Sequence, residues 1–421
     1  AELDKLGVSY NNFDMLEYGY GINLRPLATF AQDIYGDDPC TAFAPHILDK
    51  NRFDPIPEGL AAKMHKMIAI IQFKIEGQLI MEHPEYGLDH RLLLDKIDRE
   101  RGVVRAYGKE YEMKDTNLPT VDPEDPYELT PEEEEVMVAL EGSILNSGKL
   151  QRHIRYLYSH GALYKKCNGN LMFHGCIPMD ENGEFLDVTI NGETHSGAEL
   201  MEYLDEQIRD AYFNPPLGHT SAEAADLMWY LWLGPDSPLF GKDKMTTFER
   251  VFTDSKEAKK EHTVPYYKLI NDPKICEKII RSFGLDPASG KVLNGHVPVK
   301  IKDGESPIKG GGKLFVIDGG ISKAYQKTTG IAGYTFIFNS RFMALSEHKP
   351  YEPIRKDGSQ RFHDPKMQIV QNLPERMQIV DTDIGAELLR QVDDLEQLMA
   401  EYKKGTIKEV FNDPKVRKMW D

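Results

Sequence analysis

The sequence predicts a mixed α/β (α+β) fold: a helical first part, a strand-rich middle, and a C-terminal hairpin followed by a helix. Three observations carry this prediction. Apolar residues within 60–79 recur every three or four positions, as they do along one stripe of a helix. From about residue 165, apolar runs become short and end at glycines, which is typical of strands followed by turns. In the tail, MQIV occurs twice around Asn372 and Pro374, which favours a β-hairpin.

Composition narrows the class of protein. At 421 residues the chain is long enough for two or three structural units. Its formal net charge of -17 argues against a nucleic-acid-binding surface, because binding to phosphate backbones rewards clustered lysines and arginines. No stretch is long and apolar enough to span a bilayer, and the four cysteines form no CxxC pair. We therefore expect a globular, cytoplasmic protein that binds neither nucleic acid nor membrane.

The first predicted region, residues 1–150, is mainly helical. Its acidic, proline-rich segment 108–135 is expected to be an exposed connection. That segment ends in a strong helix-start signal: Thr130 is placed as N-cap, Pro131 takes the first helical position, and Glu133 closes a capping box.

The second predicted region, residues 151–345, forms the core. Strands are expected in LMFHG, VLNGHVPVKI, KLFVIDGG and YTFIFNS, with helices near 196–211 and 222–233 between them. The third region, residues 346–421, contains the hairpin and a last helix that Asp383 can cap. We expect that helix to present one apolar stripe, formed by Ile384, Leu388, Val392, Leu395, Met399 and Tyr402, and to end at Gly405.

Two histidines are candidate metal ligands. His174, in NGNLMFHGCIP, follows a predicted strand and precedes a glycine turn, and His296, in LNGHVPVK, repeats that pattern. A strand end holds an imidazole rigidly while the loop leaves room for an ion. Each histidine could instead be hydrogen-bonded within the core. The repeated pattern favours a metal site assembled from separate loops.

Candidate substrate-binding residues follow the strand in GGGKLFVIDGGISKAYQKTTG, which ends at Asp318. Two glycines let the backbone approach a ligand, and Lys323 and Gln326 supply donors suited to phosphate and sugar hydroxyls. The alternative is a solvated glycine-rich turn with surface lysines.

Further cations could bind a phosphate. They are Arg155, on a predicted helix, and Lys242 and Lys244, in a loop spanning 234–244. Taken singly, such residues are more often surface charges. The loop is rich in Pro, Gly and Asp after an aromatic run, which favours a structured loop over a pocket.

Four sequence segments are distinctive: GNLMFHGCIP, SPLFGKDKMTTFER, NGHVP and FVIDGGISKAYQKTTGIAGYT. Together they resemble the class III, Firmicutes-type fructose-1,6-bisphosphatases, and the likeness runs along essentially the whole chain. The resemblance implies a calcineurin-like metallophosphoesterase, whose α/β/β/α sandwich carries two divalent ions at the carboxyl ends of its strands. On this interpretation the chain is a partial sandwich with a large helical insertion. It would hydrolyse fructose 1,6-bisphosphate in gluconeogenesis, with manganese as the expected ion.

In that superfamily the site combines Asp-x-His, GDxxDRG and GNHD blocks with two later histidines. His174 and His296 match the later pair, and the three earlier blocks are absent. The resemblance therefore implies a fragment that lacks the N-terminal third, with the general acid upstream of Ala1. An acidic protein can still bind a bisphosphate if divalent ions supply the positive charge.

Two alternatives stay open at this stage. A superfamily relative could act on phosphoproteins or dinucleoside polyphosphates, or the chain could be a catalytically inactive fragment that retains assembly contacts. Homo-oligomerisation is compatible with either.

Overall fold

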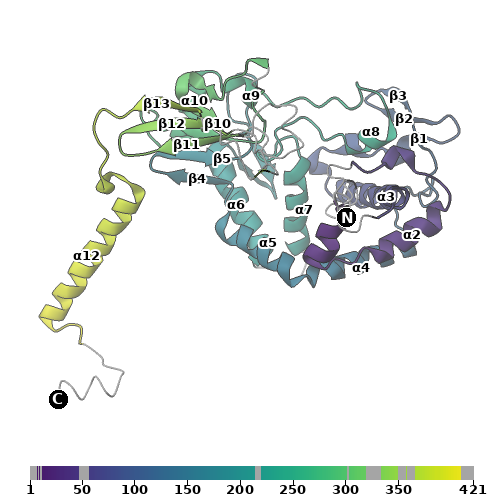
Figure 1. Ribbon diagram of the computed structural model, residues 1–421, viewed down its shortest axis with the longest axis horizontal. Coiled ribbons are helices and arrows are strands. Elements are labelled where there is room, and N and C mark those ends of the chain that lie inside the picture. Colours follow the sequence, from purple (N-terminus) through teal and green to yellow (C-terminus); the bar gives the residue numbers. More distant parts are fainter. Residues whose placement is uncertain are drawn as a thin grey trace. The chain divides into compact units, whose positions relative to one another are not determined.

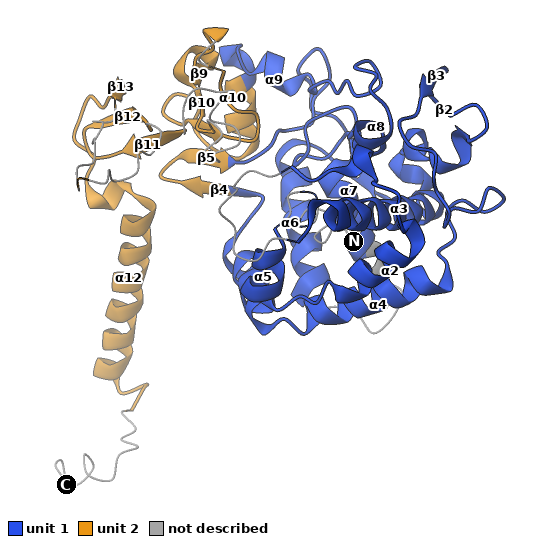
Figure 2. Ribbon diagram, turned by 45° about the vertical axis from the view of Figure 1, so that its right-hand side comes forward, with its two compact units in different colours: residues 1–164, 173–275 blue, residues 165–172, 276–421 orange. Residues whose placement is uncertain are grey.

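The computed structural model describes residues 7, 9, 12–46, 56–213, 220–300, 303–318, 333–348, 357 and 366–408 (Figure 1). Helices and strands are mixed along the chain, which confirms the predicted α/β class. The chain divides into two compact units, shown in Figure 2. The first contains residues 1–164 and 173–275, and the second contains residues 165–172 and 276–421. The domain boundaries proposed near residues 150 and 345 stay predictions.

The first unit is mainly helical. Its helices are α2 (Arg25–Tyr35), α3 (Glu58–Glu82), α4 (Pro131–Leu145), α5 (Gly148–His160), α6 (Gly197–Phe213), α7 (Thr220–Leu233), α8 (Thr247–Phe252) and α9 (Tyr266–Leu269). Short turns of helix are η1 (Met15–Gly19), η2 (Thr41–Phe43), η3 (Pro84–Tyr86), η4 (Asp89–Arg91) and η5 (Leu94–Lys96). Its strands form an antiparallel sheet of β1 (Ile97–Asp98), β2 (Val103–Ala106) and β3 (Lys109–Glu112), and a hairpin of β6 (Val188–Ile190) and β7 (Glu193–His195).

The predicted core helix is confirmed as α3, and its burial extends well beyond one stripe. Helix α2 and the short segments η2, η3 and η4 contact it. Even two of its lysines are fully buried: Lys66 pairs with Asp115 at 2.7 Å, and Lys74 pairs with Glu133 at 2.7 Å. The ion pairs neutralise charges that would otherwise be prohibitively costly inside the unit.

The predicted start of α4 is also confirmed. The hydroxyl of Thr130 accepts from the backbone N–H of Glu133 at 3.2 Å, and the Glu133 carboxylate accepts from the N–H of Thr130 at 3.0 Å. Pro131 occupies the first helical position, where its missing N–H costs nothing. A purely local motif therefore fixes where this helix begins.

The second unit is built on two sheets. The larger has the order β4 (Tyr164–Cys167), β5 (Asn170–Phe173), β8 (Val292–Asn294), β10 (Leu314–Val316) and β9 (Ile308–Lys309). The smaller is antiparallel and contains β11 (Tyr334–Phe338), β12 (Phe342–Glu347) and β13 (Lys366–Asn372). The helices α10 (Pro273–Ser282) and α12 (Asp383–Lys404) and the turns η7 (Gly310–Gly312) and η8 (Ile379–Asp381) complete the described elements.

The predicted hairpin of the two MQIV segments is wrong. The first segment lies in β13, which pairs with β12 from Glu347↔Lys366 to Phe342↔Asn372. The second leads into η8 instead of forming a strand. An established neighbouring strand offers β13 a full ladder of hydrogen bonds, whereas Pro374 lacks the N–H that a tight hairpin ladder would use. Pairing with β12 therefore outweighs the tendency of the two MQIV segments to form a local hairpin.

The last helix is confirmed as α12, with one correction at its start. Thr382 is the N-cap, because its hydroxyl accepts from the N–H of Gly385 at 3.1 Å, and Asp383 is the first helical residue. Gly405 ends the helix with φ +74, as predicted. None of the helices in the described ranges combines the length and apolar character that crossing a membrane would require.

Candidate functional site

Three neighbouring strands of the larger sheet run parallel. Leu171 of β5 lies opposite Val292 of β8, which lies opposite Leu314 of β10. Parallel strands end at a common edge, and ligands of open α/β sheets bind beyond the carboxyl ends of the strands. His296 and Asp318 each come two residues after their strand, and His174 comes directly after the last residue of β5. The candidate ligands thus follow three adjacent parallel strands.

In the second unit, backbone hydrogen bonds join the segments that carry His296 and Asp318. The N–H of Ile317 donates to the carbonyl of Asn294 at 2.8 Å, and the N–H of Val299 donates to the carbonyl of Asp318 at 3.1 Å. His296 has φ +66, a left-handed conformation that only a minority of non-glycine residues adopt. Such backbone persists where the surroundings determine it, often at functional sites.

In the first unit, His174 is exposed and a tightly packed glycine follows it. A Cβ atom at Gly175 would collide with the backbone carbonyl of Pro238. The same carbonyl accepts a hydrogen bond from the N–H of Cys176 at 2.8 Å. The chain that leaves β5 is therefore held directly against the loop 234–244.

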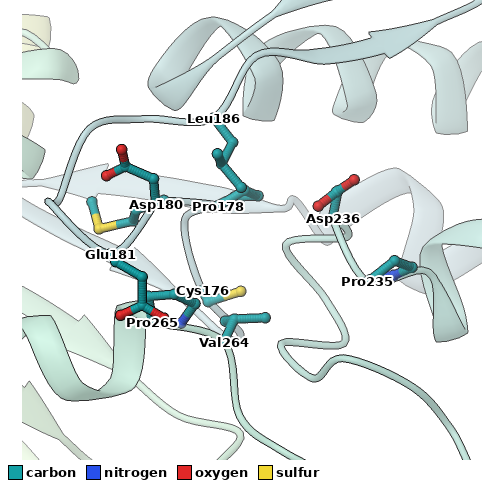
Figure 3. A pocket seen from close by; sticks show the side chains of 10 residues that line it. Cys176, Pro178, Asp180, Glu181, Leu186, Pro235, Asp236, Val264 and Pro265 are labelled. Carbon is teal, nitrogen blue, oxygen red and sulfur yellow. The ribbon is translucent and has the colours of Figure 1, made fainter.

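Cys176 also lines a pocket of about 300 Å³, shown in Figure 3. Its lining residues are Cys176, Pro178, Met179, Asp180, Glu181, Leu186, Pro235, Asp236, Val264 and Pro265. Two of them, Pro235 and Asp236, come from the loop 234–244, so this loop contributes to a pocket; that it covers a substrate site stays a prediction. The lining contains carboxylates and no lysine or arginine, so it is unsuited to binding a phosphate without an added cation.

Two carboxylates of the pocket differ in their environments. Asp180 accepts from the N–H groups of Glu184 and Asn182, each at 2.9 Å, and these bonds hold the pKa of its carboxyl below the usual range. Burial raises the pKa of Asp236. Figure 3 shows that the two come from different loops. The sequence analysis selected neither residue, although the turn sequence DENG around Asp180 was a local signal for its backbone bonds.

The two candidate loop lysines already have protein partners. Lys242 forms an ion pair with Glu261 at 2.8 Å, and the amine of Lys244 lies 3.3 Å from the centroid of the Tyr107 ring. Burial alone would raise the pKa of Glu261, but hydrogen bonds, among them those from Lys242 and Thr246, lower it to about 2. A phosphate at Lys242 would have to compete with this carboxylate.

The remaining candidates lie elsewhere. Arg155 is exposed on α5. Lys323 and Gln326 lie outside the described residues. The assignment of all these side chains to substrate therefore stays a prediction.

No group of three His, Cys, Asp or Glu side chains that could hold a metal ion occurs in the described part of the chain. A histidine that the sequence analysis did not select lies close to two carboxylates. His83 lies 2.7 Å from the Glu85 carboxylate and 3.1 Å from that of Asp226. Sequence reasoning missed it because Asp226 is 143 positions away along the chain.

A family model described as Firmicute fructose-1,6-bisphosphatase matches residues 2–404. The chain belongs to this family. Two similar proteins, both named fructose-1,6-bisphosphatase class 3, come from Clostridium tetani (strain Massachusetts / E88), 49% identical over 411 residues, and Alkaliphilus metalliredigens (strain QYMF), 50% identical over 413 residues. Each alignment covers 97% of this chain and 62% of the relative. No solved structure matches the chain significantly.

Membership of the Firmicute fructose-1,6-bisphosphatase family confirms the resemblance inferred from the sequence words. The chain spans about 62% of the length of the curated relatives it matches. The metallophosphoesterase sandwich and the roles of individual residues stay predictions.

Proposed function

We propose that the protein hydrolyses fructose 1,6-bisphosphate to fructose 6-phosphate and phosphate, as a cytoplasmic step of gluconeogenesis. The observation that carries the proposal is the near 50% identity, over 97% of the chain, to relatives named fructose-1,6-bisphosphatase class 3. A divalent ion, with manganese as the first to test, would supply positive charge and activate a water at the phosphoryl group. A chain with a net charge of -17 needs such help to hold a bisphosphate.

Within this proposal, His174 and His296 are metal ligands. Their positions within two residues of the ends of parallel strands support the assignment, because a sheet edge holds imidazoles in fixed orientations. Among the described residues, no group of three His, Cys, Asp or Glu side chains is arranged to hold an ion, so the assignment depends on these strand positions. Asp318 would contact the substrate from the third strand of the same parallel set.

Cationic and neutral donors would bind the second phosphate and the sugar hydroxyls. Lys323 and Gln326 are the first candidates, followed by Arg155, Lys242 and Lys244. Lys242 is only about one third exposed, and its partner Glu261 is nearly buried. Binding of a phosphate there would require Lys242 to leave that carboxylate, so we expect its contribution to be smaller than that of Lys323.

The decisive experiment measures phosphate release from fructose 1,6-bisphosphate by the protein with Mn²⁺. His174→Ala and His296→Ala should each lower kcat/KM by about 100-fold or more, because each removes a metal ligand. His195→Ala, at the end of β7, is the matched control and should leave the rate unchanged. Chelation with EDTA should abolish activity, and added Mn²⁺ should restore it.

Two outcomes would contradict the proposal. Faster cleavage of a phosphoprotein or a dinucleoside polyphosphate would show that the sugar assignment is wrong, and wild-type rates in either histidine variant would remove that ligand. The full-length Clostridium tetani relative serves as the comparison in this measurement.

A further inference from the structure

Three polar residues stand at the amino ends of the parallel strands of the larger sheet. Asn170 is the first residue of β5, and Lys291 and Lys313 immediately precede β8 and β10. Backbone hydrogen bonds of 2.8 Å join β5 to the carbonyl of Lys291 and β8 to the carbonyl of Lys313. Residues at the same level of neighbouring strands point to the same face of a sheet. The three side chains therefore form one row, at the opposite strand ends from His296 and Asp318.

Lys291 is buried without a negative charge beside it. Only 6% of the residue is exposed, and among the described residues its amine has no hydrogen-bond or ion-pair partner. The two buried lysines of α3, by contrast, each lie 2.7 Å from a carboxylate. Burial and the nearby ammonium of Lys313 lower the pKa of Lys291. Because an unpaired buried ammonium is costly, this position favours the binding of an anion.

Asn170 adds a hydrogen-bond acceptor that lacks a donor. The residue is 4% exposed, and its amide nitrogen donates to the carbonyls of Cys167 at 3.3 Å and Asn168 at 3.1 Å. These two carbonyls fix the orientation of the amide, because its oxygen in the same place would face two other oxygens. The amide oxygen is buried and has no partner in the described part of the chain. A ligand here has to bring both a negative charge and a proton donor.

The nearby carboxylates leave this charge uncompensated. Lys313 lies 3.8 Å from Glu277, whose carboxylate also pairs with Arg281 at 3.3 Å. The other carboxylate close to Lys313 is Asp286, which accepts from the hydroxyl of Ser289 at 2.9 Å and from a backbone N–H of its own turn at 3.0 Å. Neither forms an ion pair with the second lysine of the row. A local excess of positive charge therefore exists within an acidic protein.

We propose that Asn170, Lys291 and Lys313 bind a hydrogen phosphate ion. The two ammonium groups donate to its oxygens, and its own hydroxyl donates to the amide oxygen of Asn170. Sulfate has the same shape but carries no proton near neutral pH, so the site should select phosphate over sulfate. Asn170 and Lys291 are nearly buried, which suits a small inorganic ion better than a sugar or a nucleotide. This proposal does not depend on the reaction proposed above.

Calorimetric titration of the 421-residue protein, in chloride buffer with EDTA, tests the binding. EDTA removes divalent ions, so a metal-dependent site does not contribute. Phosphate should bind about 10-fold more tightly than sulfate at equal ionic strength. Lys291→Met keeps most of the side-chain volume without the charge and should weaken phosphate binding by about 10-fold or more. Lys165→Met, at an exposed position of β4 in the same sheet, is the matched control and should bind normally.

Thermal unfolding distinguishes a ligand site from a lysine that only supports the fold. Without phosphate, Lys291→Met should unfold at the same temperature as the wild type or higher, because it removes an unpaired buried charge. Phosphate should raise the midpoint of the wild type and of Lys165→Met, but not that of Lys291→Met.

Four results would overturn the proposal. They are no saturable binding of phosphate, equal binding of sulfate by the wild type, normal phosphate binding by Lys291→Met, and a lower stability of Lys291→Met than of the wild type without phosphate. The last result would show that Lys291 has a stabilising partner within the protein.

Discussion

Removing Lys74, one of the two buried lysines of α3, should cost the first unit much of its stability. The Lys74 amine lies 2.7 Å from the Glu133 carboxylate and 2.6 Å from the carbonyl of Thr120, and both charged side chains are fully buried. Lys74→Met fills nearly the same volume but leaves Glu133 as an uncompensated buried charge. Breaking one side of such a pair costs about 3–5 kcal/mol.

The double variant Lys74→Met/Glu133→Gln distinguishes the effect of the unpaired buried charge from the effect of changed packing. Glutamine keeps the capping box of α4 but carries no charge. The double variant should therefore be more stable than Lys74→Met, by about 1–3 kcal/mol, which is a large coupling between neighbours. If the buried charge is not the cause of the loss, the double variant will instead be the less stable of the two.

Urea unfolding, followed by tryptophan fluorescence, measures both effects. Trp229 and Trp232 belong to the same unit as Lys74, and replacing Trp420, the third tryptophan, by Phe in every protein compared leaves a signal that reports on that unit. Lys109→Met is the matched control: Lys109 pairs with Glu257 on the surface, where both side chains are more than half exposed, and its loss should not shift the midpoint measurably. A Lys74→Met midpoint as close to wild type as that of the control would refute the reasoning.

Two further predictions follow from other contacts. Burial alone would lower the pKa of His83, but hydrogen bonds to Glu85 and Asp226 raise it above its ordinary value of 6.5. Its protonated form thus stabilises the first unit fully below that value, and the stabilisation is lost as pH rises through the raised pKa. Urea midpoints should fall over this range in the wild type and less so in His83→Gln; parallel curves would contradict the assignment. Gly175→Ala should lower stability by about 1–3 kcal/mol, because its Cβ would push against the Pro238 carbonyl. An unchanged midpoint in Gly175→Ala, with Gly142→Ala compared as an uncrowded glycine of the same unit, would contradict the close packing.

The sequence by itself determined the features that depend on local chemistry. The capping box at Thr130 and the left-handed end of α12 at Gly405 each involve only a few neighbouring residues. A short stretch of sequence is therefore enough to predict them. The same holds for the strands that precede His174 and His296, whose apolar runs and glycine turns are contiguous. Family membership could likewise be predicted from four short sequence segments.

Only the tertiary structure decided which segments meet. It paired the first MQIV segment with β12, surrounded α3 so completely that Lys66 and Lys74 are buried, and brought Asp226 to His83. Periodicity reports that a helix has an apolar stripe but not what covers it, and for this reason the stripe of α12 was predicted correctly while its exposure was not. Contacts between distant residues depend on packing across the whole unit, and no short stretch of sequence encodes them.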